Sequence, residues 1–293
     1  MKLAFVILHY QNMEVTEKCL SMLRGLDSYN KAVVVIVDNA SSNGSGKVLK
    51  EKYSPIPNID VIINASNEGF AKGNNLGYAY AKNTLHANVI VVMNSDVFIE
   101  DAAFINKAVG AFEKETIDVI APDIYALKGF YQNPISQRAL TYQEVLRWYY
   151  KVCLLQAGVK LPLLGDLVAK ILQNKHDRND RIKAQKNEEL RKKQYDVVPH
   201  GACVIFGNKW VENVPFAFVP FTYMYCEEYL LAYYISKYSF KTVFMPDIKV
   251  THEAGASRKI DYSRLTAQMK AFYKNEKHSI AQLMKMMKGE NEL

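Results

Sequence analysis

The chain has 293 residues, 49% of them hydrophobic, and a formal net charge of +7. This length and composition predict a globular protein with one large domain and an elaboration. No run reaches the ~18 apolar residues of a membrane-spanning helix and the first apolar run is short for a signal peptide, so we expect a cytoplasmic protein.

The cysteines and histidines are scattered along the chain. There is no CxxC pair and no Cys/His cluster at zinc spacing. We therefore expect reduced thiols, and any metal should be held by oxygen ligands or by residues distant in sequence. The four cysteines are Cys19, Cys153, Cys203 and Cys226.

Short apolar runs that end in polar residues dominate the first third of the chain and are typical of strands buried on both faces. Segments 12–26 and 72–83 predict helices between them. Strands that alternate with helices predict an α/β fold with a mostly parallel central sheet. The four runs are residues 2–8, 32–38, 59–64 and 88–94.

Polar residues follow each of these strands. In parallel sheets, ligands bind beyond the carboxyl ends of the strands, so these residues should lie along one rim. They are His9, Tyr10, Asp38, Asn39, residues 64–67, Asn94, Ser95 and Asp96.

The pattern changes near residue 125. Residues 139–195 predict helices of mixed apolar and charged character, and strand character returns at 195–207. We therefore predict a helical insertion or lid at 125–195. Within it, residues 170–193 hold nine Lys or Arg and four acidic residues. This basic run is either a solvated face, as on a lid or dimer interface, or a landing patch for anionic lipid.

Two segments of the first half have the composition of a ligand site. Asp38 precedes the small polar loop NASSNGSG, where its carboxylate would accept from a pyrimidine imide or ribose hydroxyls; ordinary turn chemistry is the alternative. In NASNEGFAKGNNLG, Gly69, Gly73 and Gly77 predict a bare helix face that packs closely on a ligand or only on the protein. The polar residues among them are Asn67, Lys72, Asn74 and Asn75.

Candidate metal ligands follow two of the strands. In VVMNSDV, Asn94 adds a polar contact and Asp96 a carboxylate, which a hard cation binds together with phosphate oxygens. Asp96 followed by a helix start would instead be an N-cap. His252 follows a later strand and is either a second ligand or a structural histidine.

A pair of acids, Glu227 and Glu228, interrupts the apolar segment YMYCEEYLLAYYI. Unpaired burial of a carboxylate is unfavourable. At a helix start facing a cleft, one of them would serve as a general base, whereas a surface pair on a helix is the alternative.

Taken together, these motifs resemble glycosyltransferase family 2, and within it the bacterial rhamnosyltransferase-like members. The matching stretches occur in family order across residues 6–257. They are VILHYQN, VDNASSNGS, NEGFAKGNNLG, MNSDV, HGACVIFG, YMYCEEYLLAYYI and PDIKVTHEAGAS.

The resemblance implies a glycosyltransferase A-type fold and inverting transfer of a sugar, such as rhamnose, from a dTDP- or UDP-linked donor. It implies a divalent cation, Mg²⁺ or Mn²⁺, and places Asp96 where the metal-binding motif ends; His252 is the second candidate ligand. Glu228 stands where the family has the Asp of a Glu-Asp pair, so both Glu228 and Glu227 are candidate bases. The resemblance places Asp38 where such enzymes contact the base. The candidate donor contacts are His9, Tyr10, Asp38, Asn67, Gly69, Lys72, Asn74, Asn75, Asn94 and Ser95.

The implied acceptor is a hydroxyl of a growing cell-surface glycan or a lipid-linked acceptor. We expect no nucleic-acid partner, a homodimer as one option, and contact with the inner face of the membrane through residues 170–193. The predicted parts are a donor-binding half (1–124), the basic insertion (125–195), an acceptor and catalytic part (196–257) and a C-terminal helical segment (258–293).

Two alternatives remain. A nucleotidyltransferase also places metal-binding carboxylates on an α/β sheet, but it needs a basic phosphate-binding loop near the first strand, where LHYQNMEV has none. A non-catalytic sugar-nucleotide-binding protein is the other alternative, because Asn94 and Glu228 depart from the family pattern.

Overall fold

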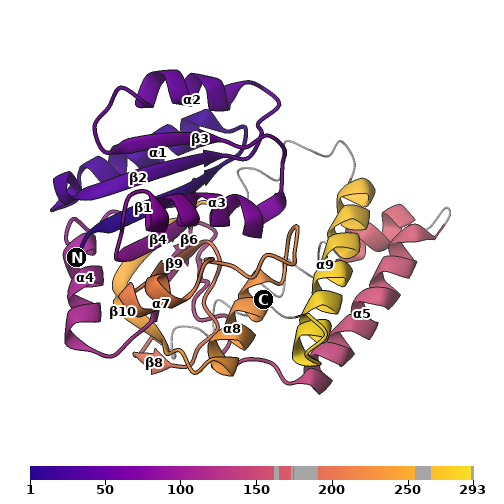
Figure 1. Ribbon diagram of the computed structural model, residues 1–293. Coiled ribbons are helices and arrows are strands. Elements are labelled where there is room, and N and C mark those ends of the chain that lie inside the picture. The colour runs from indigo at the N-terminus through magenta and orange to yellow at the C-terminus, as the bar shows by residue number, and fades with distance from the viewer. Residues whose placement is uncertain (162–164, 173, 175–190, 255–264, 292–293) are drawn as a thin grey trace.

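The computed structural model describes residues 1–161, 165–172, 174, 191–254 and 265–291. Within them, ten strands form one sheet (Figure 1). The strands are β1 (Leu3–His9), β2 (Ala32–Asp38), β3 (Ile59–Ile63), β4 (Val89–Asn94), β5 (Val97–Phe98), β6 (Val119–Ala126), β7 (Phe130–Tyr131), β8 (Gln194–Tyr195), β9 (Cys203–Phe206) and β10 (Thr242–His252).

The strand order is β3-β2-β1-β4-β9-β6-β10-β5, with β7 beside β6 and β8 beside β10. The four strands predicted in the first third are confirmed as β1 to β4, and they pair in parallel. The rest of the sheet is mixed, because β9 runs antiparallel to both β4 and β6 while β6 and β10 are parallel. The mostly parallel arrangement therefore holds for the first half only.

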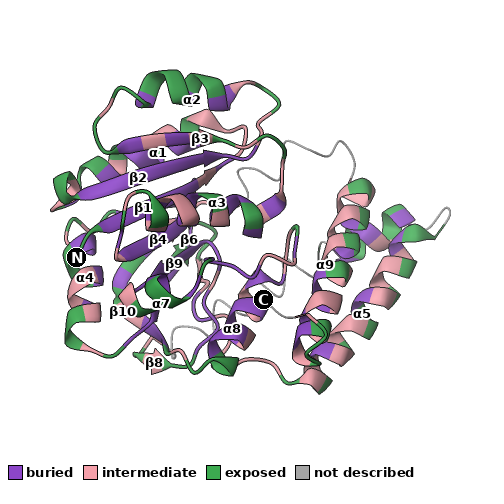
Figure 2. Ribbon diagram, in the orientation of Figure 1, coloured by how far each residue is buried: buried purple, intermediate pink, exposed green. Residues whose placement is uncertain are grey.

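Helices cover both faces of this sheet. One apolar core lies under α1 (Met13–Arg24), α2 (Ser45–Tyr53) and α4 (Phe104–Lys114). The other lies under α3 (Gly69–Asn83), α7 (Asn208–Asn213) and α8 (Glu227–Lys237), and it extends to α5 (Tyr142–Lys160) and α9 (Leu265–Met287). The central strands β1, β2, β4 and β9 are accordingly almost wholly buried, whereas β7 and β8 are not (Figure 2).

The predicted insertion, 125–195, includes sheet strands at both of its ends. The sheet continues past residue 125 as the end of β6 and as β7, and it resumes at β8 before residue 195. Between them lie α5 and a second helix at 165–172. The two helices α5 and α9 pack side by side, apart from the sheet (Figure 1).

Two further expectations are affected by the structure. The residues after Asp96 are not a helix start, because Val97 and Phe98 form β5 against the end of β10. Most of the basic run, at 175–190, lies outside the described residues. Among the helices that are described, none is both long and apolar enough to cross a membrane.

Candidate functional site

The polar strand ends lie along one rim, as the parallel order predicts. His9 is in register with Asp38, and Leu8 is in register with Asn94. The carboxyl ends of β1, β2 and β4 therefore meet at one edge of the sheet.

His9 is fully buried beneath this rim. Its Nδ1 is 2.7 Å from Thr16 Oγ1 and its Nε2 is 2.8 Å from Ser45 Oγ. Burial lowers the pKa of His9, against the opposing effect of Asp38, whose Oδ1 lies 3.9 Å from Nε2. A neutral His9 thus joins α1 and α2 to the end of β1, and its neighbour Tyr10 is half-buried.

Asp38 is also buried, at 2% exposure. Its carboxylate accepts from the Ser41 backbone amide at 3.3 Å and packs against Gly46, where a Cβ atom would overlap it. Because Gly46 has no side chain, there is room for the carboxylate beside the turn before α2. In this arrangement Asp38 has the turn chemistry that was its alternative interpretation.

An asparagine network joins the ends of β2 and β3 to α3. Asn39 Nδ2 donates to Asn67 Oδ1 at 3.0 Å and to the Gly69 carbonyl at 3.1 Å. Asn67 Oδ1 also accepts from the Gly69 amide. Gly69 has φ +82° and lies against the Tyr223 carbonyl, so a side chain there would collide with the loop before α8.

The bare face of α3 packs on the sheet. A Cβ at Gly73 would lie 2.8 Å from Leu8 Cδ1, and one at Gly77 would lie 2.5 Å from Val6 Cγ1. These contacts of Gly73 and Gly77 are those of a helix that packs on the protein itself.

The polar residues of α3 divide between internal contacts and solvent. Asn75 donates to the Phe218 carbonyl at 2.6 Å and accepts from two backbone amides, so its side chain braces the segment before α8. Asn74 is fully buried and donates to the Phe70 carbonyl, and its Oδ1 has no partner. Lys72 is exposed, and its Nζ lies 3.7 Å from Glu68 Oε2.

The structure brings Asp96 and His252 together. Both are 6% exposed, and His252 Nε2 lies 3.2 Å from Asp96 Oδ1. They meet because β5, directly after Asp96, pairs antiparallel with the last two residues of β10. Ser95, between Asn94 and Asp96, is also buried.

The tautomer of His252 bears on its suitability as a ligand. Its Nδ1 lies 2.6 Å from Gln132 Oε1, which only accepts, so Nδ1 carries a proton. When Nε2 carries no proton, its lone pair faces the Asp96 carboxylate oxygen. Two such acceptors fit a shared cation.

As metal ligands, Asp96 and His252 would supply two positions from the protein, which is not a complete cage. Among the described residues, no group of three or more His, Cys, Asp or Glu side chains is placed to hold a metal ion. A cation at this pair would therefore need oxygen atoms from a ligand or water, which is usual for Mg²⁺ bound with phosphates.

The structure adds residues that the sequence motifs did not single out. The His200 ring lies 6.0 Å from the His252 ring, and the His200 amide donates to Asn133 Oδ1 at 2.6 Å. His200 was visible in the HGACVIFG motif, whereas Gln132 and Asn133 fell within the predicted insertion. Only the pairing of β7 with β6 places them here.

The acid pair begins α8, and its two members have different surroundings. Glu227 is buried, accepts from Thr222 Oγ1 at 3.0 Å, and has its pKa raised to about 8 by burial and by the negative charge of Glu228. Glu228 is half-buried, and its Oε1 accepts from the Gly201 amide at 3.2 Å. The Asn94 amide donates to the carbonyl of Ala202, the residue that follows Gly201.

The segment 200–202 therefore joins the two parts of the site. It contacts Asn94 on β4 and Glu228 on α8, and it places His200 beside His252. The arrangement offers a cation position and a partly accessible carboxylate at one rim. These are the groups needed to stabilise a leaving phosphate and to deprotonate a nucleophile.

The helix pair α5–α9 contacts the same region. Trp148 Nε1 on α5 donates to Glu276 Oε1 on α9 at 3.1 Å, and the Trp148 ring packs edge-on against Tyr229, next to Glu228. Burial raises the pKa of Glu276 to about 7.

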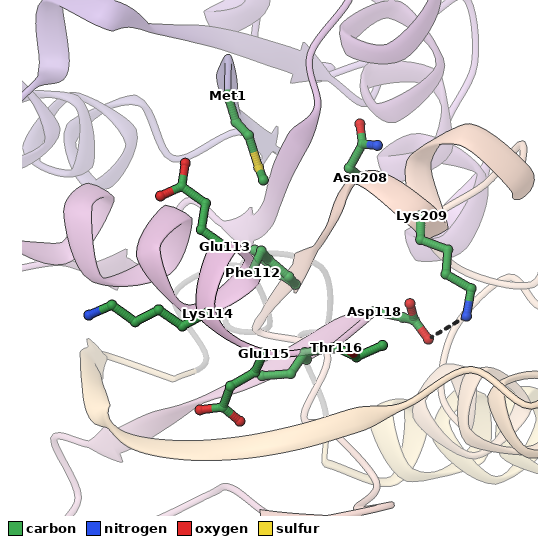
Figure 3. A pocket seen from close by; sticks show the side chains of 10 residues that line it. Met1, Phe112, Glu113, Lys114, Glu115, Thr116, Asp118, Asn208 and Lys209 are labelled. Carbon is green, nitrogen blue, oxygen red and sulfur yellow. Dashed lines mark hydrogen bonds and ion pairs between the residues drawn. The ribbon is translucent and has the colours of Figure 1, made fainter.

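A cavity of about 370 Å³ lies elsewhere, between the end of α4 and the start of α7 (Figure 3). Its lining includes Met1, Asp118 and Lys209. Met1 and Asp118 precede the amino ends of β1 and β6, so this cavity is at the edge of the sheet opposite the rim that carries Asp96.

Comparisons with known proteins agree with this architecture. The family model for glycosyl transferase family 2 matches residues 4–161. No curated protein sequence matches the chain. Among solved structures, residues 1–349 of TarS from S. aureus have a TM-score of 0.54 at 15% identity, covering 86% of this chain and 60% of that one. This chain therefore spans less than two thirds of the length of that structure.

Two further structures have a comparable likeness. A mannosyltransferase, PcManGT from Pyrobaculum calidifontis, solved with GDP-Man and Mn²⁺, has a TM-score of 0.52 at 12% identity and covers 100% of this chain and 76% of that one. GalNAc-T7, solved with UDP, GalNAc and Mn²⁺, has a TM-score of 0.58 at 14% identity. The match covers 86% of this chain and 44% of GalNAc-T7. At these identities the likeness establishes the fold.

Proposed function

The chain belongs to glycosyltransferase family 2 and has the glycosyltransferase A-type fold, and from this premise we propose that it transfers a sugar, with inversion, from a nucleotide-diphosphate donor to an acceptor hydroxyl. The proposal depends above all on one observation, the Asp96–His252 pair at the same rim as Glu228. Support also comes from similar structures, because TarS was solved with UDP and with UDP-GlcNAc, and PcManGT with GDP-Man.

Glu228 is the proposed base. It is half-buried, whereas Glu227 is 3% exposed and its raised pKa keeps it protonated at neutral pH. Glu228 takes the proton from the acceptor hydroxyl while that oxygen attacks the anomeric carbon. The bond from that carbon to the diphosphate oxygen breaks on the opposite face, so the configuration inverts.

Asp96 and His252 are the proposed ligands of a divalent cation, Mg²⁺ or Mn²⁺. A cation bound there would neutralise charge on the leaving diphosphate. Asn94 and Ser95 lie beside this position, while His9, Asp38 and Asn67 act from below the rim by holding its loops. We propose a growing glycan or lipid-linked acceptor for the hydroxyl, and rhamnose is one candidate sugar.

A donor screen tests this function. Purified chain with Mn²⁺ or Mg²⁺ should be thermally stabilised by one class of nucleotide-diphosphate sugar, and the same donor should be slowly hydrolysed to the nucleoside diphosphate. Stabilisation without hydrolysis or transfer would identify a binding protein. If no nucleotide sugar of the dTDP, UDP or GDP series binds with either metal, the proposed function is wrong.

A further inference from the structure

Large apolar side chains are exposed on α5, just after it, and on the helix at 165–172. We define the outer face by the apolar residues Tyr150, Leu154, Leu161, Leu167 and Ile171. The exposed fraction of these residues runs from 49% at Leu161 to 75% at Leu154. No described part of the chain covers them.

The periodicity of α5 produces this face. Arg147, Tyr150, Lys151, Leu154 and Leu161 recur at helical spacing and are all exposed. The opposite stripe of the helix is buried, and it packs toward α9, which lies between α5 and α8 (Figure 1). The helix thus has two apolar sides and is covered on only one.

The helix at 165–172 adds exposed apolar residues next to the end of α5. It packs on the end of α5, where a Cβ at Gly158 would lie 3.4 Å from Val168 Cγ1. Its buried positions are Gly165, Ala169 and Leu172, and its exposed ones include Leu167, Lys170 and Ile171.

The charged residues of this face are mainly cations. Arg147, Lys151 and Lys170 are exposed among the apolar side chains. The exposed acid on the second helix, Asp166, accepts a hydrogen bond from Thr266. A second copy of this face, related by a two-fold axis, would bring the cations of both copies together, which is unfavourable. An anionic surface complements them.

From these observations we infer that the outer face docks on an anionic lipid bilayer. Leu154, Leu161, Leu167 and Ile171 enter the boundary between headgroups and acyl chains, while the cations lie at the level of the lipid phosphates. Apolar residues flanked by Lys and Arg on a surface helix have the pattern of an in-plane membrane helix. Docking is independent of the proposed function, because it requires neither donor nor metal.

Vesicle sedimentation with the full chain tests the inference without any substrate. The vesicles are phosphatidylcholine alone, or phosphatidylcholine with about one quarter phosphatidylglycerol, where the surface potential is negative. The chain should sediment only with the anionic vesicles, and less so at high salt, because salt screens the cations.

Matched variants locate the contact. Two double variants change the outer face. One combines Leu154→Glu with Ile171→Glu, and the other combines Lys151→Gln with Lys170→Gln. Each should reduce the partition coefficient between anionic vesicles and water by about tenfold or more. Two control variants change exposed residues of the same kinds elsewhere on the chain. They are Val48→Glu with Leu127→Glu, and Lys47→Gln with Lys50→Gln. Both controls should bind as the unmodified chain does. Circular dichroism checks that each variant is folded.

Three results would overturn the inference. The first is equal recovery in the supernatant with both kinds of vesicle. The second is unchanged binding by the two outer-face variants, which would place the contact elsewhere on the chain. The third is that the unmodified chain does not bind vesicles but forms a concentration-dependent dimer, which Leu154→Glu with Ile171→Glu converts to a monomer. That result would assign the face to contact with a second copy.

Discussion

Two contacts orient the His252 ring. Gln132 accepts from Nδ1 and Asp96 faces Nε2, so the ring presents one defined nitrogen to the rim. This orientation is the usual one for a metal-bound histidine, whose second nitrogen donates to an oxygen. Gln132 is accordingly a residue that sets the tautomer, although nothing in its sequence context indicates a ligand site.

The two acids of α8 should respond differently to removal of their charge. Glu228→Gln should lower turnover by about 10² to 10⁴, because it removes the base, and should leave the donor Kd within a few-fold. Glu227→Gln should be milder, since this group is already protonated at neutral pH. Steady-state kinetics and donor titration of both variants check this; the reverse order would assign the base to Glu227.

The raised pKa of Glu227 predicts a pH-dependent stability. Its pKa is about 8 in the folded state against a reference of 4.5, so between these values the folded chain holds a proton that the unfolded chain has lost. The free energy of unfolding should therefore fall as pH rises through this range, by up to about 1.4 kcal/mol for each pH unit.

Denaturant titrations across this pH range compare the chain with Glu227→Gln, which keeps an acceptor for Thr222 and cannot ionise. The variant should lose less stability on going to pH 8, whereas exposed Glu100→Gln should follow the unmodified chain. Parallel curves for all three proteins would mean that Glu227 is ionised in the folded state.

At the scale of elements, the glycines of α3 set how closely the helix approaches the sheet. Gly77→Ala should destabilise the fold by about 1–3 kcal/mol, because its Cβ would lie 2.5 Å from Val6 Cγ1 and 2.7 Å from Val37 Cγ2. Gly110→Ala is the matched control, since it is also within a helix, α4, and has no atom within 4 Å of the added Cβ.

Thermal or chemical denaturation measures both changes. Gly110→Ala should stabilise the fold by about 0.5–1 kcal/mol, the usual helix preference for alanine. Equal behaviour of the two variants would show that α3 has room to shift away from β1.

The sequence predicts those elements whose signal is local. Continuous apolar runs locate β1 to β4, and their order along the chain places His9, Asp38 and Asn94 at one rim. The short strands β5 and β7 have no such signal, because two residues show no periodicity. Since β5 joins Asp96 to His252 and β7 positions Gln132, the second half of the site depends on pairings that only the folded chain reveals.

At the scale of the whole molecule, the antiparallel β9 explains why the sheet is mixed. It enters between β4 and β6 after the long excursion through α5, and it follows the segment 200–202 that contacts both Asn94 and Glu228. The excursion and the C-terminal helix form one unit, α5–α9, on the side of the molecule next to the acid pair. Their pairing spans a large sequence separation, so local patterns predict the helices and not their contact.

The most direct test of the account is the metal dependence of donor turnover in Asp96→Asn, which keeps the size of the side chain and removes its charge. Nucleoside diphosphate release should rise with Mn²⁺ or Mg²⁺ in the unmodified chain and in the exposed control Asp27→Asn. In Asp96→Asn it should fall by at least about 10² at any metal concentration. Metal-stimulated release by Asp96→Asn at the level of the control would contradict the assignment of this rim as the catalytic site.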